Sequence, residues 1–223
     1  MQALPVHRVS PTIATMNTPR FLNFLDAMDG IVARAAHESS VLDQGEAALK
    51  SLIAHNDWLP LEYAKPVSER YQSYALYVDA QARYSVISFV WAPGQGTPVH
   101  NHTVWGLVGV LRGAERCEEF ADFPVRPEAA EQALGGQTPR FAHGERVATN
   151  THNLLRGEVD RVSPTIGDWH KVSNALADET SISIHVYGAD IGRVQRNYWD
   201  ATTNTLQPMV SGYSNDTPWI TAR

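Results

Sequence analysis

The sequence predicts a mainly β protein in which helices precede a single antiparallel barrel. Short segments rich in β-branched and aromatic residues follow one another beyond Pro66, separated by Gly, Pro, Asn and Asp. Helical periodicity, by contrast, is confined to residues 18–60. The chain has 223 residues, enough for one domain with a sizeable core and too few for two large ones. We therefore expect one domain over residues 1–223.

The N-terminal quarter is expected to be helical. Residues 1–17 have no clear pattern and are expected to be irregular. Thr18 and Pro19 are typical of a helix N-cap followed by proline at the first position, and apolar residues then recur at helical spacing. A second helix is expected over residues 44–55. Together these features predict a helical region over residues 18–60.

The barrel is expected over residues 66–205. A stretch over residues 118–144 contains prolines, adjacent glycines and several acids, and it is interpreted as an extended loop or insertion. The expected strands lie at residues 74–77, 84–91, 105–111, 146–149, 157–162, 171–173 and 181–187.

Composition and charge exclude several functions. The net charge of −6 and pI of about 5.8 argue against nucleic-acid or anionic-membrane partners, which require clustered Lys and Arg. The chain has no apolar run that could span a bilayer, and its first residues do not resemble a secretory signal, so we expect a cytoplasmic protein. Cys117 is the only cysteine, which rules out an intrachain disulfide; we expect it to be buried and inert.

Three histidines are candidates for one metal site. His100 and His102 are two residues apart on an expected strand or strand entry, where alternate side chains point the same way. His170 lies far downstream, after a Gly167-Asp168 pair typical of a turn that presents it from another strand. Five further histidines are interpreted as non-ligands: His7, His37 and His55 lie outside the barrel, and His143 and His152 are expected at the surface.

These segments resemble the two motifs of the cupin family. The spacing is kept by Gly94, His100, His102 and Gly113 in the first motif and by Gly167, His170 and Asn174 in the second, while Pro164 sits one place early. The resemblance implies a cupin double-stranded β-helix, a jelly-roll barrel. Gly106 stands where the family has a glutamate ligand. Three neutral imidazoles would then leave half of an octahedral shell open, and the net +2 site would favour an anionic ligand such as a thiolate. A structural zinc site would instead be closed.

A second polar group lies on one expected strand. Ser183, His185 and Tyr187 alternate with Ile184 and Val186, so the three polar side chains share one face. If this face points inward, a hydroxyl, an imidazole and a phenol can form a hydrogen-bonded row. Taken alone, the pattern also fits an outward polar face.

Three segments together resemble the cysteine dioxygenase family of thiol dioxygenases. They are Thr103-Val104-Trp105-Gly106, Gly167-Asp168-Trp169-His170 and the Ser-x-His-x-Tyr row, and the resemblance covers roughly residues 70–200. It implies one Fe(II) per chain bound by His100, His102 and His170. It also implies that Ser183, His185 and Tyr187 form the outer-sphere catalytic triad, and that a small thiol and O2 are the substrates.

Two departures point to the bacterial branch that favours 3-mercaptopropionate. The mammalian enzyme crosslinks a cysteine to its tyrosine, and Gly106 looks like the matching position. Cysteine-specific members hold the substrate carboxylate with an arginine at the start of the barrel, where Gln72 is the candidate here. Arg196 is the main alternative for holding the carboxylate, with Arg193 second.

Other functions fit the same motifs. One is a three-histidine cupin dioxygenase acting on cysteine, mercaptosuccinate, a diketone or an aminothiol. Another is a non-catalytic cupin that binds a small ligand. The sequence leaves the physiological thiol and the oligomeric state open.

Overall fold

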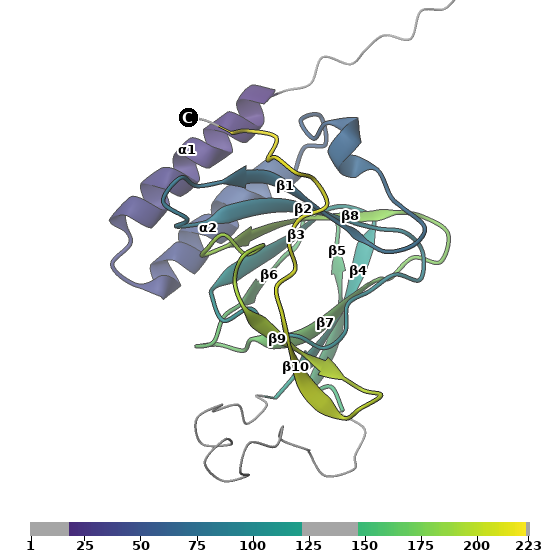
Figure 1. Cartoon of the computed structure of the whole chain (residues 1–223). Coiled ribbons are helices and arrows are strands. Elements are labelled where there is room, and N and C mark those ends of the chain that lie inside the picture. The colour runs from purple at the N-terminus through teal and green to yellow at the C-terminus, as the bar shows by residue number, and fades with distance from the viewer. Residues whose placement is uncertain (1–17, 122–146, 222–223) are drawn as a thin grey trace, which may run out of the picture.

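The computed structural model describes residues 18–121 and 147–221 (Figure 1). Two helices come first, α1 (Thr18–Arg34) and α2 (Glu38–Ile53), and a short 3-10 helix follows at Leu61–Ala64. Ten strands follow in the rest of the described chain. They are β1 (Gln72–Val78), β2 (Ser85–Trp91), β3 (Gly106–Arg112), β4 (Ala114–Phe120), β5 (Asn150–Leu155), β6 (Val159–Val162), β7 (Trp169–Asn174), β8 (Ser181–Tyr187), β9 (Arg196–Asp200) and β10 (Thr205–Met209).

The strands form two antiparallel layers and a hairpin. One layer has the order β1-β2-β8-β3-β6, the other has the order β5-β4-β7, and β9 pairs with β10. The segment from Gly96 to His100 joins the smaller layer to the hairpin, because it bridges to β7 on one side and to β9 on the other. This is the cupin double-stranded β-helix that the sequence predicts, with two N-terminal helices added.

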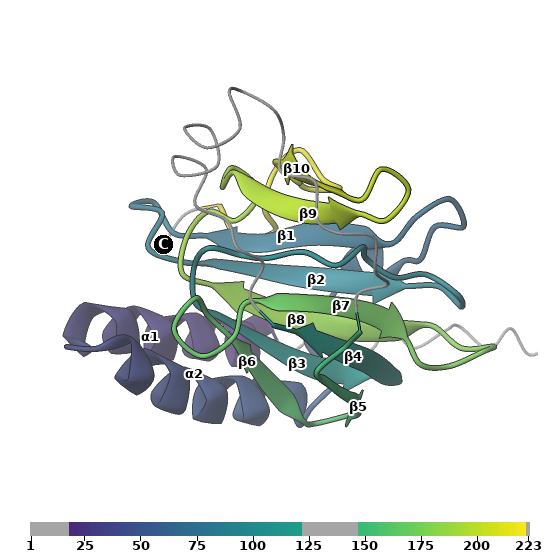
Figure 2. The same ribbon diagram turned by 90° about the horizontal axis from the view of Figure 1, so that it is seen from below.

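The helices cover the outer face of the five-stranded layer, as Figure 2 shows. They bury the apolar faces that the spacing predicts, including Phe21, Leu25 and Met28 of α1. The second helix begins six residues earlier than expected, at Glu38 instead of residue 44. The burial of Val41 explains the difference, because packing against the core outweighs weak local helix propensity. Within residues 18–121 and 147–221, no helix is long and apolar enough to cross a membrane.

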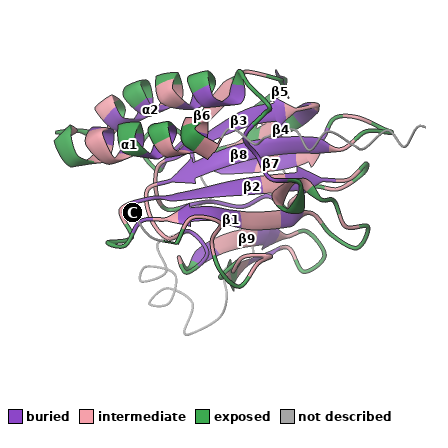
Figure 3. Ribbon diagram, turned by 90° about the horizontal axis from the view of Figure 1, so that it is seen from above, coloured by how far each residue is buried: buried purple, intermediate pink, exposed green. Residues whose placement is uncertain are grey.

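Strand β8 is buried on both faces, and this decides where its polar row points. All seven of its residues are buried (Figure 3). Ile184 and Val186 pack in the core cluster beneath the helices. Ser183 and His185 therefore face the barrel interior, so the alternative of an outward polar face is wrong.

The strand predictions are wrong where charged residues obscure the alternating pattern and where strands follow β8 in the sequence. Strand β4 carries four charged residues and was expected to be partly a loop, and β9 and β10 were not expected. The strand expected at 146–149 is β5, at Asn150–Leu155. The expected irregular N-terminus, His7, His143 and most of the 118–144 insertion lie outside the described residues.

Candidate metal centre

Backbone pairing fixes two of the three histidines to each other. The His100 amide donates to the His170 carbonyl at 2.9 Å, and the His170 amide donates back at 3.0 Å. On the other side, the Trp199 amide donates to the Val99 carbonyl at 2.7 Å. His100 thus lies on a bridging segment held between β7 and β9, and His102 follows just before a turn at Thr103, whose φ is 62°.

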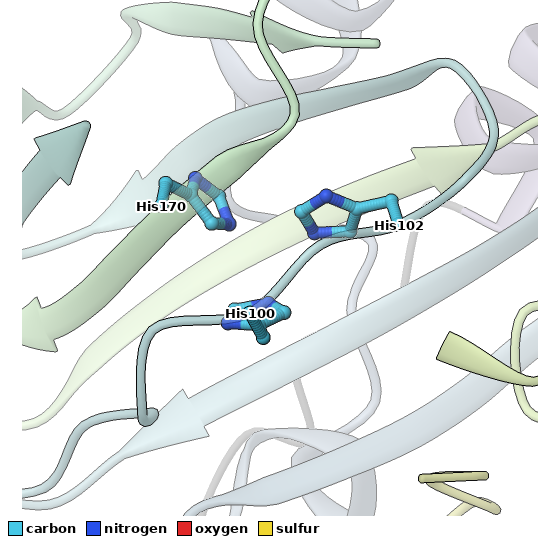
Figure 4. Close-up of side chains that lie close together, drawn as sticks. All are labelled: His100, His102 and His170. Atoms are coloured by element: carbon cyan, nitrogen blue, oxygen red, sulfur yellow. The ribbon is translucent and has the colours of Figure 1, made fainter. Parts of the chain in front are cut away.

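The three imidazoles converge on one point, as Figure 4 shows. Their ring centroids lie 4.7–4.9 Å apart, and their ligand nitrogens lie within 4.8 Å of one another. All three residues are buried. His100, His102 and His170 therefore form the predicted cluster, which can hold a metal ion.

Hydrogen bonds orient two of the rings for metal binding. The His100 Nδ1 lies 3.0 Å from the Pro98 carbonyl oxygen, and the His102 Nδ1 lies 3.0 Å from Asp168 Oδ1. Each bond leaves the Nε2 atom of its ring free, and His102 Nε2 is buried without a hydrogen-bond partner. Burial lowers the pKa of all three imidazoles, so the rings are held in the neutral form that binds metals.

Asp168 anchors the loop that carries His102. Its Oδ1 accepts hydrogen bonds from the His102 amide at 2.9 Å and from His102 Nδ1, and its Oδ2 accepts one from the Thr103 amide at 2.9 Å. Sequence reasoning placed Asp168 only in a turn. The acceptor role becomes visible only once the two loops lie together, because 66 residues separate the partners.

A small pocket opens onto the metal centre. Its volume is about 160 Å³, below the roughly 300–1,000 Å³ typical of drug-sized ligand sites. The lining side chains include polar groups from the barrel and from the C-terminal segment; they are Arg70, Tyr71, Ser73, Thr97, His100, His170, His185, Tyr187, Arg196, Ser211, Tyr213 and Ser214, with Phe89, Trp91, Pro98, Val172 and Met209 as the apolar part. This pocket suits a ligand of a few heavy atoms.

Arg196 is a buried cation that faces this pocket. It is 5% exposed, and its Nη2 donates to Ser211 Oγ at 2.8 Å while its Nε has no hydrogen-bond partner. Within the described residues no carboxylate forms an ion pair with it. Burial is the main cause of the lowered pKa of His100 and His185, and the positive charge of Arg196 adds to it. A buried, partly unpartnered guanidinium favours an anionic ligand.

The other two candidates for holding a carboxylate are displaced from the pocket. Arg193 has 88% of its side chain exposed and pairs with Asp190. Gln72 is buried, but its amide donates to the backbone carbonyls of Arg70 and Tyr71 and it does not line the pocket. Strand alternation explains this correction, since the neighbours of Gln72 at positions 71 and 73 face the pocket instead.

The polar row of β8 forms a continuous hydrogen-bonded chain. Ser183 Oγ lies 2.8 Å from His185 Nε2, and His185 Nδ1 lies 2.8 Å from the Tyr187 hydroxyl. The Trp91 indole donates to Ser183 Oγ at 3.3 Å. An indole N–H can only donate. In the form of His185 that carries its proton on Nδ1, Ser183 donates to His185, His185 donates to Tyr187, and the Tyr187 hydroxyl hydrogen is left for the pocket. Burial raises the Tyr187 pKa, which keeps the phenol protonated as a donor.

A buried carboxyl group lies behind this row. Glu115 is fully buried, and Ser181 Oγ donates to its Oε1 at 3.2 Å. Burial raises the Glu115 pKa to about 7, while nearby donors on Ser183, Ser181 and Trp91 oppose that rise. Sequence reasoning missed Glu115 and Trp91 because neither belongs to a motif; only the strand register brings them to Ser183.

Gly106 leaves the space that the Tyr187 ring fills. The two residues are direct partners between β3 and β8. A Cβ at position 106 would lie 2.7 Å from Tyr187 Cδ1 and 2.9 Å from Val162 Cγ2, closer than side chains pack. The ring stacks on His102 with centroids 5.2 Å apart. The space beside Gly106 is therefore occupied by an aromatic ring next to the metal centre.

Comparisons with known proteins return distant barrels. No family model matches the chain. A double-stranded β-helix protein from Klebsiella pneumoniae has 14% identity and a TM-score of 0.41, over 60% of this chain and 91% of its own. A cupin 2 domain-containing protein from Halorhodospira halophila has 14% identity and a TM-score of 0.42, over 62% and 77%. The cupin fold is assigned here from the strand order of this chain itself.

Proposed function

We propose that this protein is an iron-dependent dioxygenase that converts a small thiol carboxylate, 3-mercaptopropionate above all, to its sulfinate. One observation carries the proposal: a single small pocket is lined by His100 and His170 of the metal centre and by the buried, partly unpartnered Arg196. The pocket thus offers a metal position for a thiolate and a cation for a carboxylate. Its volume of about 160 Å³ suits a short chain between the two.

The three-histidine set fits iron(II) because it is neutral, facial and open on the pocket side. An iron(II) ion on these nitrogens would supply open coordination positions and the electron transfer that O2 activation needs. The overall reaction, RS⁻ + O2 → RSO2⁻, balances without an added reductant, since sulfur loses the electrons that O2 gains. Arg196 would hold the carboxylate by charge-assisted hydrogen bonds from Nε and Nη, which fixes the direction of the sulfur end.

The row on β8 would orient the reacting groups. With the His185 proton on Nδ1, donation would run from Trp91 through Ser183 and His185 and would leave the Tyr187 hydroxyl hydrogen for the pocket. A fixed, buried donor is worth more than one in water, because it need not reorganise as charge develops. Tyr187 would therefore stabilise negative charge on oxygen or sulfur without binding the metal.

The charge of the pocket favours 3-mercaptopropionate over cysteine. The two thiols have similar carboxylate and sulfur ends, but cysteine adds an ammonium group. No acidic side chain is among the described residues that line the pocket, whereas two arginines are. An ammonium ion would be desolvated beside Arg196 without a counter-charge, which is unfavourable.

Mercaptosuccinate is a second candidate because of Arg70. This arginine is exposed and lies in the pocket lining, where it can meet a second carboxylate while Arg196 holds the first. A non-catalytic small-ligand cupin remains the alternative from another class. It would bind the same anions without consuming O2.

The deciding experiment is a panel of thiols assayed for O2 uptake with protein of known iron content. We expect up to one iron per chain and a larger kcat/KM for 3-mercaptopropionate than for L-cysteine, mercaptosuccinate or cysteamine. Mass spectrometry with ¹⁸O2 should place both labelled atoms on the sulfinate. Binding of 3-mercaptopropionate without O2 uptake would identify a binding protein, and equal use of cysteine would show that the charge argument is wrong.

A further inference from the structure

A second group of metal-ligating side chains lies away from the pocket described above. Cys117, His152 and Asp160 each offer a ligand atom, and these atoms lie within 4.8 Å of one another. The sequence alone predicts an inert core residue at Cys117 and a surface residue at His152. The structure corrects the second view, because His152 is half-buried and its Nε2 lies 2.7 Å from Asp160 Oδ2.

The strand register explains why these three side chains meet. Cys117 on β4 and His152 on β5 are direct partners in the ladder, so their side chains leave the sheet on the same face. Asp160 comes from β6, the last strand of the five-stranded layer, whereas β5 is the last strand of the other layer. The cluster therefore spans the seam where the edges of the two layers meet.

Two further features favour an ion at this seam. The Nδ1 atom of His152 is buried without a hydrogen-bond partner, and the Glu119 carboxylate lies 3.7 Å from it. Glu119 is two residues beyond Cys117 on β4, so it lies on the same face of the sheet and adds negative charge beside the cluster. A cleft lined by Cys117, Glu119 and Asp160 gives access from the surface.

We propose that Cys117, His152 and Asp160 form a second metal site, which binds a zinc-class divalent ion. Thiolate, imidazole and carboxylate together are a donor set typical of Zn²⁺, whereas Mg²⁺ and Ca²⁺ prefer oxygen alone. Binding would replace the thiol proton of Cys117 by the metal, with that proton released to solvent. The ion would link β4 and β5 to β6 and so hold the two layers together.

Cobalt(II) distinguishes this site from the three-histidine centre. Cys117 is the only cysteine, so a near-ultraviolet thiolate-to-cobalt charge-transfer band can arise from this chain only at Cys117. We expect anaerobic titration of the iron-loaded protein, with no thiol reductant present, to give this band with saturation at one cobalt per chain. Zinc should abolish the band by competition.

Matched variants locate the ion. Cys117→Ser should remove the band, and His152→Ala and Asp160→Asn should each weaken cobalt binding at least about tenfold, since each removes one ligand. His100→Ala should lose iron yet keep the band. Zinc should also raise the Tm of the wild type but not that of Cys117→Ala, which keeps the test usable if Cys117→Ser folds poorly. The proposal is overturned if no band appears, if His152→Ala binds cobalt as tightly as the wild type, or if His100→Ala abolishes the band.

Discussion

The barrel holds two groups of metal-ligating side chains that are built in opposite ways. In the three-histidine centre, all rings are buried, and the hydrogen bonds of His100 and His102 leave their Nε2 atoms free. In the seam cluster, His152 and Asp160 are about 30% and 28% exposed and bond to each other. The first group is ready for a metal without rearrangement, whereas the second must give up the hydrogen bond between His152 and Asp160. Preorganisation therefore predicts tight binding at the centre and weaker, conditional binding at the seam.

The largest expected effect is the loss of iron from the centre. His100→Ala, His102→Ala and His170→Ala should each lose most of the iron and all detectable O2 uptake, because two imidazoles cannot form the facial set. His152→Ala, the control, removes a histidine from the seam cluster instead, and this variant should keep both its iron and its O2 uptake. Metal analysis and O2 uptake on the four variants check this. Full iron occupancy in any of the first three would break the assignment of the centre.

Two arginines, Arg196 and Arg193, also differ in burial and in pairing. Arg196 is buried beside the centre and has no acidic partner among the described residues, whereas Arg193 is exposed and paired with Asp190. Removing the cation that holds a buried carboxylate typically costs about 2–5 kcal/mol, or roughly 30- to several-thousand-fold. Arg196→Ala should lower kcat/KM for 3-mercaptopropionate by such a factor. Arg193→Ala should leave it unchanged, and equal effects of the two variants would mean that another group holds the carboxylate.

Substitutions in the hydrogen-bonded row on β8 should lower the activity by a smaller factor. Tyr187→Phe keeps the ring that packs against His102 and removes one donor, so fold and iron content should persist while kcat falls about a hundredfold. His185→Gln should act on the same unit, and the double variant should lose less than the product of the two single losses. Fully multiplicative losses would show that the two residues act independently. Intact-mass analysis of the wild type should also show no thioether between Cys117 and Tyr187.

Local patterns predicted the parts of the site that lie within single strands or motifs. Strand alternation placed Ser183, His185 and Tyr187 on one face, and the resemblance to the two cupin motifs predicted that His170 joins His100 and His102. Gly106 marked the missing glutamate, and the structure adds that its hydrogen side chain makes room for the Tyr187 ring. In these cases the information lies in a few neighbouring residues, so a sequence suffices.

The predictions failed where residues from distant segments meet. Gln72 was assigned to the pocket, but an uncertainty of one residue in a strand reverses the face on which a side chain lies. Trp91 and Glu115 reach Ser183 only through the register of separate strands, and Ser211 closes the pocket from a segment beyond the expected end of the barrel at residue 205. Such contacts depend on topology, which no local pattern encodes.

The smallest expected effect contrasts Asp168, which supports the centre, with Asp160, which belongs to the seam. Asp168 uses both oxygens to accept three hydrogen bonds from His102 and Thr103. In Asp168→Asn, one oxygen becomes an NH2 group that cannot accept, so either Thr103 or His102 keeps an unpaired donor, and the negative charge behind His102 is lost.

Losing such a supporting carboxylate typically weakens metal binding about 10- to 100-fold. We expect Asp168→Asn to lose iron to a chelator correspondingly sooner than the wild type, with the fold intact. Asp160→Asn removes a charge that also pairs with a histidine, but that histidine belongs to the seam cluster and not to the three-histidine centre. It should hold iron as the wild type does. If both variants lost iron equally, the two groups would be coupled through the cleft that reaches from Cys117 to Asp168, and the contrast between them would have to be abandoned.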